Sequence, residues 1–218
     1  MAKPFDLREP RVHPPDLPVA FEDAERPELR GDHYQLRFPG MSGDIDASYA
    51  SIVECRLEPS SVQDFILRGA ALADVAVQDL QAVQVVGRQS HWRRVAIVGG
   101  RIASLDLSGA TLNSVELRGL RLDYVNFAGA DLADVLITGC RIATIDMPQG
   151  TLKRVRFHGS TAEEVDTRET RIEHLDLRGL DVTRFLDIRS LRGATFSTEQ
   201  ATLHSAALAR AVGLDLRG

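Results

Sequence analysis

The chain has few cysteines, few aromatic residues and no long apolar run. Its 218 residues include two cysteines and one tryptophan, and aromatic residues make up 6% of the total. Cys55 and Cys140 are too few for a disulfide framework, and no segment reaches the ~20 apolar residues of a membrane span. Met1 to Pro18 contains no apolar core of a signal peptide. We therefore expect a cytoplasmic protein that does not enter a membrane.

An excess of charge of one sign is also missing. The chain has 26 basic and 31 acidic residues and a formal net charge of −5. Generic binding to the phosphate backbone of nucleic acid needs a clear basic excess, so we expect no direct nucleic-acid binding. One segment stands apart from this pattern, because VVGRQSHWRRV, residues 85–95, places the only tryptophan beside a histidine and two arginines. Trp92 is either a contact for nucleic acid or a part of the core.

Sequence signals of catalysis and cofactor binding are absent as well. The chain has no G-x-S-x-G, no Walker loop, no C-x-x-C and no H-E-x-x-H. His91, His158 and His174 have no second ligand at a spacing that suits a metal ion, so we expect them on the solvated surface. The sequence therefore predicts no catalytic residue, no metal and no cofactor.

The dominant pattern is a five-residue repeat. From Ile52 to Val182, 25 of the 27 positions spaced five apart are apolar, in a chain that is 44% hydrophobic. Only Gly87 and Thr167 interrupt this series, and no insertion shifts its frame. A second series of apolar or small residues runs two positions earlier, from Ala50 to Phe185. Neither the helical period of about 3.6 nor the strand period of about 2 produces this pattern.

Residue size in the second series reveals a longer period of twenty residues. Every twentieth residue from Ala50 is small, and every twentieth residue from Phe65 is large. Four sides of five residues therefore form one coil, with two residues of each side pointing inward. Between residues 45 and 190 this predicts about seven coils, stacked at the ~4.8 Å spacing of paired strands. Cys55 and Cys140 fall in the inward series, where we expect them to be core residues.

The repeat units resemble a known family. Runs such as LSGATLNSVELRGL and NFAGADLADV resemble the A-(D/N)-L-x-x motif of pentapeptide-repeat proteins. The resemblance covers residues 45–190 and implies an all-β fold, the right-handed quadrilateral β-helix of that family. Tight corners with positive φ are predicted by a recurring glycine at Gly99, Gly119, Gly139, Gly159 and Gly179.

The N-terminal segment, residues 1–44, lies outside the repeat and contains most of the prolines. The interpretation we favour is an extended, partly mobile lead, and the alternative is a docking peptide. Tyr34, Leu36 and Phe38 are predicted to start the first coil or to cover its open end, which would otherwise expose unpaired strand edges.

The C-terminal segment, residues 191–218, is predicted to form one short α-helix and a tail. Ser197 and Gln200 form a capping box at its start, and the helix ends at Gly213. The segment resembles the C-terminal segment of the quinolone-resistance members of the family, which dimerise end to end through it. The resemblance implies a homodimer, and the alternative is a capping helix in a monomer. Three of the expected contact residues are also predicted to face the last coil (Leu203, Ala207 and Leu208), and two lie in the tail (Leu214 and Leu216).

Two columns of charge recur at a spacing of twenty residues. The acidic column consists of Asp106, Asn126, Asp146 and Asp166, and the arginine column consists of Arg101, Arg121 and Arg141. The acidic column is either part of a DNA-like stripe or a set of short polar side chains that bond nearby backbone groups. In the second case the arginine column neutralises the acidic column across the corner.

The family resemblance implies a binding protein without catalytic activity. Members with known roles often act on DNA gyrase or its relatives, as rods that imitate duplex DNA, and they inhibit the enzyme or shield it from poisons. Transferred to this chain, that role assigns the partner contact to Asp106, Asp146 and Asp166. The chain lacks the loops that some quinolone-resistance members insert between coils. The alternative is a structural or scaffold module that binds another protein.

The frame of the repeat also predicts where the tryptophan lies. Ala82, Gly87 and Trp92 occupy successive central positions of one coil, where neighbouring coils have a valine or isoleucine, a leucine and a leucine. Because interiors pack to nearly constant density, the indole is predicted to fill the volume that the two small residues leave. The alternative is a local bulge that turns Trp92 outward.

Overall fold

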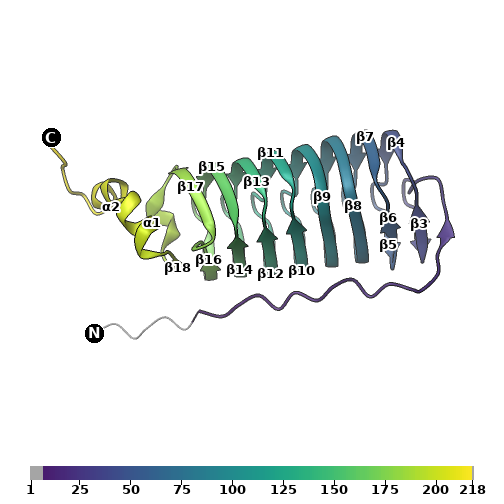
Figure 1. The fold of residues 1–218 in the computed structure, drawn as a ribbon, viewed down its shortest axis with the longest axis horizontal. Helices are drawn as coiled ribbons and strands as arrows, with labels where there is room; N and C mark the ends of the chain where they lie inside the picture. The colour runs from purple at the N-terminus through teal and green to yellow at the C-terminus, as the bar shows by residue number, and fades with distance from the viewer. Residues whose placement is uncertain (1–6, 218) are drawn as a thin grey trace.

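A computed structural model describes residues 7–217, which form a solenoid of parallel strands followed by short helices (Figure 1). The all-β β-helix predicted from the sequence is confirmed, with about eight turns rather than about seven. The strands are β1 (Glu22–Asp23), β2 (Asp32–Tyr34), β3 (Leu36–Phe38), β4 (Ser42–Asp46), β5 (Ser51–Val53), β6 (Arg56–Leu57), β7 (Ser60–Ile66), β8 (Ala71–Val86), β9 (His91–Asp106), β10 (Thr111–Arg118), β11 (Arg121–Asn126), β12 (Asp131–Thr138), β13 (Arg141–Asp146), β14 (Thr151–His158), β15 (Ser160–Asp166), β16 (Arg171–Asp176), β17 (Leu180–Phe185) and β18 (Ala194–Thr195).

The strand register has the period of twenty residues that the sequence predicts. Leu112, for example, pairs with Trp92 on one side and with Leu132 on the other. The first turn is one residue shorter, since Asp32 pairs with Ser51. A register shift between Gly43 and Ile45 then restores the period. This irregularity explains why the sequence frame becomes visible only near residue 45, although parallel pairing begins earlier.

Both inward series form a continuous apolar core. Gly87 and Thr167, which interrupt the series, are buried as well, and so are Cys55 and Cys140. Trp92 is only 2% exposed, and a Cβ added to Gly87 would lie 3.4 Å from its Cζ2 atom. The indole therefore packs beside Gly87, as predicted, together with Leu107, whose Cδ2 atom would lie 2.7 Å from that Cβ. The bulge that would turn Trp92 outward, and with it the nucleic-acid contact, is wrong.

The glycine column follows the prediction at four of its five positions. Gly99, Gly119, Gly139 and Gly159 have φ values of +71°, +65°, +61° and +56°. Gly179 does not have a positive φ, so the prediction of a left-handed corner is wrong there. Glycine is required at this position for another reason, because a Cβ would lie 2.5 Å from the carbonyl oxygen of Phe157 in the preceding coil.

The C-terminal cap contains three short helices rather than one. They are the 3-10 helix η1 (Ile188–Leu191), α1 (Thr198–Leu203) and α2 (Ser205–Ala211). The capping box predicted at the start of α1 is confirmed, since Ser197 and Gln200 exchange both hydrogen bonds. Helix α1 ends after six residues, at His204, whose side chain packs edge-on against the Phe185 ring at 5.1 Å. The break at His204 divides the single helix that the sequence pattern predicts into α1 and α2.

At the other end of the solenoid, the chain begins as an extended segment. Residues 7–20 run along the length of the rod, beneath β8 to β16, before the chain turns into β1 and β3 (Figure 1). Phe38 on β3 is fully buried at the end of the core, in line with the prediction that this segment starts the first coil. The extended segment contacts the coils directly.

Candidate functional site

The acidic column forms as predicted. Asn126 pairs with Asp106 on one side and with Asp146 on the other, and Asp146 pairs with Asp166, so the four side chains stack on successive coils. The side chains of Asp106 and Asp166 are only 7% and 3% exposed. Asp146 is half-buried. The column is therefore largely recessed in the wall of the solenoid.

Each aspartate of the acidic column has its own hydrogen-bond partners. Asp106 accepts the backbone amide of Ser108 at 3.0 Å and the Arg88 guanidinium at 2.5 Å. Burial alone would raise the pKa of Asp106, but these bonds outweigh burial and lower it. Asp166 bonds the amide and the guanidinium of Arg168 in the same way, and its pKa is lowered for the same reasons.

Asp146 is held by a phenol instead of a guanidinium. The Tyr124 hydroxyl donates to Asp146 at 2.6 Å. Burial, together with this bond to a carboxylate, raises the pKa of Tyr124 to about 12. The predicted bonding of short polar side chains to nearby backbone is confirmed for Asp106 and Asp166, and Asn126 bonds the Ala128 amide in the same way.

The arginine column also lines up, but it does not neutralise the acidic column. Arg121 pairs in register with Arg101 and Arg141, and all three are exposed. Arg101 forms its ion pair with Asp123, at 2.9 Å. The neutralisation predicted across the corner is therefore wrong. Two other arginines neutralise the acidic column instead. Arg88, on the preceding coil, pairs with Asp106, and Arg168, two residues further along the chain, pairs with Asp166.

A second column is occupied by the extended N-terminal segment. We call residues 7–18 the strap, and we call the six residues below it the docking column: Asp74, Arg94, Ser114, Asp134, Arg154 and His174. All six have positive φ, between +51° and +63°. The strand ladder skips them, for example between the Ala73–Arg93 and Val75–Val95 pairs. They are thus corner residues, one on each coil.

The strap donates backbone amides to side chains of the docking column. The amides of Arg11 and Asp16 donate to Asp134 and Asp74 at 2.9 and 3.0 Å. The amide of His13 donates to the Ser114 hydroxyl at 2.7 Å, and that of Arg8 donates to Nδ1 of His174 at 3.3 Å. Asp74, Ser114 and Asp134 are buried. The strap is thus extended, as predicted, and its contacts with the coils agree with the docking-peptide alternative.

The two arginines of the docking column hold its carboxylates. Arg94 binds Asp74 through two nitrogens, and Arg154 binds Asp134 through two nitrogens at 2.6 Å each. The Arg154 bonds and the Arg11 amide lower the pKa of Asp134 against the effect of burial. At Asp74 burial is the largest influence, yet the Arg94 bonds and the Asp16 amide outweigh it, and the pKa is lowered too.

The docking column was missed in the sequence, although it carries a signal there. Read at a spacing of twenty residues, it is acidic, basic, hydroxyl, acidic, basic and histidine. His174, predicted to be a solvated surface residue, has a side chain that is only 13% exposed and accepts the Arg8 amide. That prediction is wrong because the strap covers it. His91 and His158 are exposed as predicted.

The C-terminal residues assigned to dimerisation are mostly exposed. Leu203 is 68% exposed and Leu214 58%, Ala207 and Leu216 are exposed too, and Leu208 is half-buried. The prediction that Leu203 and Ala207 face the last coil is wrong. Gln200 faces the coil instead, because its side-chain amide donates to the carbonyls of Leu177 and Leu180 at 2.7 Å each. These bonds fix which side of α1 points outward.

Comparisons with known proteins agree with this geometry. The family model described as pentapeptide repeats matches residues 105–139 in 8 copies. The matched segment lies in the middle of the coils, where the register has no irregularity. Residues 105–139 therefore consist of pentapeptide repeats, and they lie within a solenoid that has the β-helix fold.

Solved structures of other pentapeptide-repeat proteins share only a low similarity with this one. Trypsin-treated QnrB1, a plasmid-mediated fluoroquinolone resistance protein, is 17% identical, with a TM-score of 0.38, over 86% of this chain and 100% of that chain. HetL, a protein involved in heterocyst differentiation regulation from the cyanobacterium Nostoc, is 16% identical, with a TM-score of 0.38, over 76% of this chain and 86% of that chain. No curated protein sequence matches the chain. Such values assign no function to this chain.

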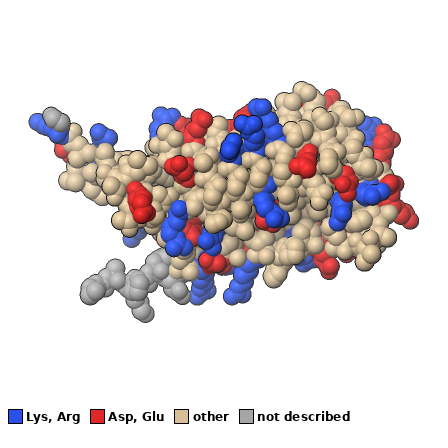
Figure 2. All heavy atoms as spheres, in the orientation of Figure 1, with Lys and Arg blue, Asp and Glu red and all other residues tan. Residues whose placement is uncertain are grey.

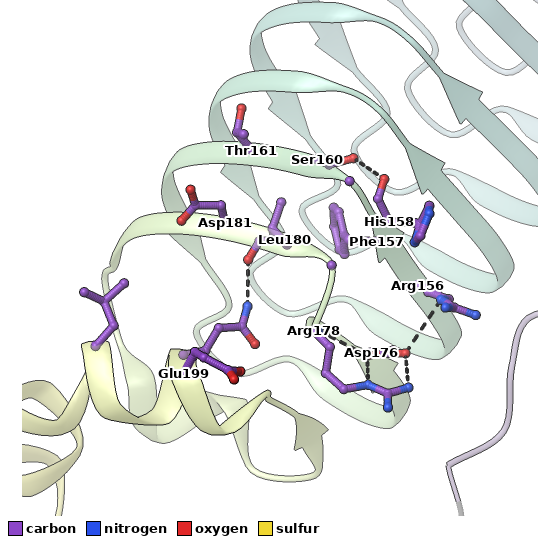
Figure 3. A pocket seen from close by; sticks show the side chains of 14 residues that line it. Arg156, Phe157, His158, Ser160, Thr161, Asp176, Arg178, Leu180, Asp181 and Glu199 are labelled. Atoms are coloured by element: carbon purple, nitrogen blue, oxygen red, sulfur yellow. Dashed lines mark hydrogen bonds and ion pairs between the residues drawn. The ribbon is translucent and has the colours of Figure 1, made fainter.

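A groove lies between the last coils of the solenoid and α1 (Figure 3). Its volume is about 920 Å³. Figure 3 shows Arg156, Asp176 and Arg178 gathered on one side, with Asp181 and Glu199 apart from them. Asp176 is already paired with Arg178, at 2.8 Å, so it has little charge to offer a ligand. Within residues 7–217, no group of three or more potential ligand side chains is placed to hold a metal ion.

The helices of the C-terminal cap are short. None of the helices in the described chain is long and apolar enough to cross a membrane.

Proposed function

We propose that this pentapeptide-repeat protein is a non-catalytic binding protein that presents the side of its β-helix to a protein partner. The observation that carries this proposal is the constant register of twenty residues between β5 and β17, which aligns equivalent side chains along each face. Solenoids create extended binding surfaces in this way. The partner we propose is DNA gyrase, the target implied by the resemblance to the quinolone-resistance members of the family.

In the acidic column, Asp146 is the residue that best supports the gyrase proposal. Asp106 and Asp166 are recessed and neutralised by arginines, whereas Asp146 is half-buried and bonded only to the neutral Tyr124 hydroxyl. Asp146 is therefore the most accessible of the three carboxylates, and no arginine donates a hydrogen bond to it among the described residues. In this proposal it makes the contact, and Asp106 and Asp166 hold the wall of the solenoid that supports it.

A supercoiling assay tests this proposal. Purified full-length protein is added to gyrase and relaxed plasmid, with and without a fluoroquinolone. We expect inhibition of supercoiling, or protection from the drug, at micromolar protein or below. Absence of both effects at micromolar protein would exclude gyrase as the partner.

A matched pair of variants separates charge from structure. Asp146→Asn removes the charge and keeps the shape of the side chain, whereas Tyr124→Phe removes the hydrogen bond and keeps the carboxylate. If the charge makes the contact, Asp146→Asn loses the effect on gyrase and Tyr124→Phe retains it. Loss in both variants would instead assign the effect to the local fold, which thermal unfolding of each variant checks.

A second candidate function is a scaffold module that binds another protein. It is favoured by the surface charge, because Figure 2 shows basic and acidic side chains interspersed over one face, without a continuous stripe of either sign. Ion pairs between Arg37 and Asp23 and between Arg184 and Glu164 also balance opposite charges at the surface. A negative result in the gyrase assay, together with an intact fold, would favour this function.

The proposal includes a homodimer formed through the C-terminal cap and a cytoplasmic location. Exposed leucines at the end of a rod form an apolar surface that a second copy would cover. Leu203→Glu combined with Leu214→Glu is expected to convert a dimer into a monomer in sedimentation analysis. Val83→Glu is the control, since Val83 is also an exposed aliphatic residue and lies outside the cap. A wild-type monomer at micromolar concentration would refute the dimer, and cell fractionation tests the location.

A further inference from the structure

We propose that the docking column is a binding site for an extended, proline-containing peptide, and that the strap occupies this site as a ligand built into the chain. The site recognises backbone amides through side chains, so its ligand class is defined by the spacing of those amides. The inference is independent of the partner on the other faces.

The length of an extended chain matches the spacing of the coils. The four acceptors of the docking column span five coil intervals, from His174 to Asp74, or about 24 Å at ~4.8 Å per coil. The strap spans the same distance from Arg8 to Asp16. Eight residues of polyproline II rise about 25 Å at ~3.1 Å each. An extended peptide can therefore stay in register along the whole column.

The order of donors follows the order of acceptors. The acceptors are separated by two, one and two coils, because Arg94 and Arg154 stand at the two coils that are skipped. The donors are the amides of residues 8, 11, 13 and 16, which are separated by three, two and three residues. Three extended residues cover about two coils. Arg94 and Arg154 accept no amide, so their places in the docking column determine the spacing of the ligand residues that donate.

The prolines of the strap fit this pattern. Proline has no backbone N–H and favours an extended chain. All the prolines of the strap stand at positions that do not donate: Pro10, Pro14, Pro15 and Pro18. A shift of the strap by two residues toward its N-terminus would put Pro10, Pro15 and Pro18 at donor positions. The prolines therefore disfavour that alternative register and reduce the entropy that the strap loses on binding.

Apolar side chains of the strap add a second element of recognition. Each donor is preceded by a half-buried apolar residue, namely Leu7, Pro10, Val12 and Pro15, whereas the donors themselves are exposed. The ligand motif is thus a repeated pair of an apolar residue and an amide donor. One side-chain contact fixes the direction of the strap, because Glu9 accepts from Arg156 at 2.7 Å.

Because the strap belongs to the same chain as the docking column, it competes with any other peptide of this class for binding to that column. A tethered ligand acts at an effective concentration in the millimolar range for short flexible linkers. A free peptide therefore binds the wild-type chain only when the strap has left. The docking column becomes available to a partner's extended segment once the strap is released.

The experiment uses full-length protein and a labelled peptide with the sequence of residues 7–18. In the double variant Arg11→Pro/His13→Pro, two strap amides are removed while the chain stays extended. The matched control is Val12→Pro, which adds proline at a half-buried position that does not donate. Peptide binding is measured by fluorescence anisotropy, hydrogen exchange reports whether the strap is seated, and circular dichroism checks the fold.

We expect the double variant to bind the free peptide at least about tenfold more tightly than wild type, because two amide bonds to the tethered competitor are lost. Val12→Pro should bind it like wild type. Adding Asp134→Ala to the double variant should weaken binding about tenfold or more, since a charge-assisted bond is lost. Equal binding to wild type and to the double variant, or no binding to a double variant whose strap is released, would overturn the proposal. A strap that remains seated in the double variant would overturn it too.

Discussion

Replacing Trp92 by leucine tests the packing of the core most directly. The side chain loses six non-hydrogen atoms from a position that is only 2% exposed. At about 0.8 kcal/mol for each buried methylene-sized group, this loss costs roughly 4–5 kcal/mol. One contribution has the opposite sign, because the buried indole N–H has no hydrogen-bond partner. Removing an unsatisfied buried donor regains about 1–3 kcal/mol. We therefore expect Trp92→Leu to lower the free energy of unfolding by about 2–3 kcal/mol.

Trp92→Phe separates the two contributions. Phenylalanine removes three of the ring atoms, at a cost of about 2–3 kcal/mol, but it also removes the unsatisfied N–H. The two effects nearly cancel, so this variant is expected to be within about 1 kcal/mol of wild type. Arg93→Ala is the surface control. Its side chain is 56% exposed and its nearest carboxylate oxygen is 3.9 Å away, so we expect a change below about 0.5 kcal/mol.

Urea unfolding followed by circular dichroism measures these differences. The expected order of stability is wild type close to Trp92→Phe and Arg93→Ala, with Trp92→Leu clearly lower. Negligible destabilisation by Trp92→Leu would show that the coil repacks around the smaller side chain, and the filling of the space beside Gly87 would then not stabilise the fold. A large loss in Trp92→Phe would show that the indole N–H has an acceptor.

Three further predictions concern the corners, the strap and the cap. Gly179→Ala should destabilise the protein by more than about 2 kcal/mol, since its Cβ meets backbone atoms, whereas Gly139→Ala, with a φ of +61° and open space, should cost about 1 kcal/mol in thermal unfolding. Stability should fall as the pH drops below about 4, because Asp74 and Asp134 have lowered pKa values in the folded state. A lowered folded pKa contributes stability above the unfolded value and loses it as the pH falls through the folded value. Asp134→Asn should therefore flatten the dependence of the urea midpoint between pH 7 and pH 3, and an unchanged slope would refute this. Gln200→Ala should loosen α1 from the last coil, seen as faster hydrogen exchange in Leu203 and its neighbours.

The sequence predicts the parts of this fold that depend on a repeated residue type. The inward series and the period of twenty are visible because each coil needs apolar residues at the same positions. The capping box is predictable for a similar reason, since Ser197 and Gln200 interact over a few residues. Gly179 shows the limit, because the same glycine column serves a left-handed corner in four coils and a close backbone approach in the fifth.

The partners of charged residues could not be predicted in the same way. A spacing of twenty places Arg101 beside Asp106 only approximately, and the direction in which each side chain bends decides that Arg88 is the partner. The docking column poses a greater difficulty, since its members have different chemistry on each coil. Its meaning depends on a segment more than fifty residues away from the nearest member, and periodicity within the coils contains no information about that segment.

The docking column and the acidic column show two ways in which stacked carboxylates are accommodated in the same solenoid. Like charges at the coil spacing repel, so a column of aspartates needs a partner on every coil or a neutral residue between. In the acidic column, Asn126 and the Tyr124 hydroxyl interrupt the charge, and arginines beside the column supply the rest. In the docking column, arginines stand within the column itself. That arrangement leaves one face of each carboxylate to accept a backbone amide, and it is the reason that an extended chain can bind there.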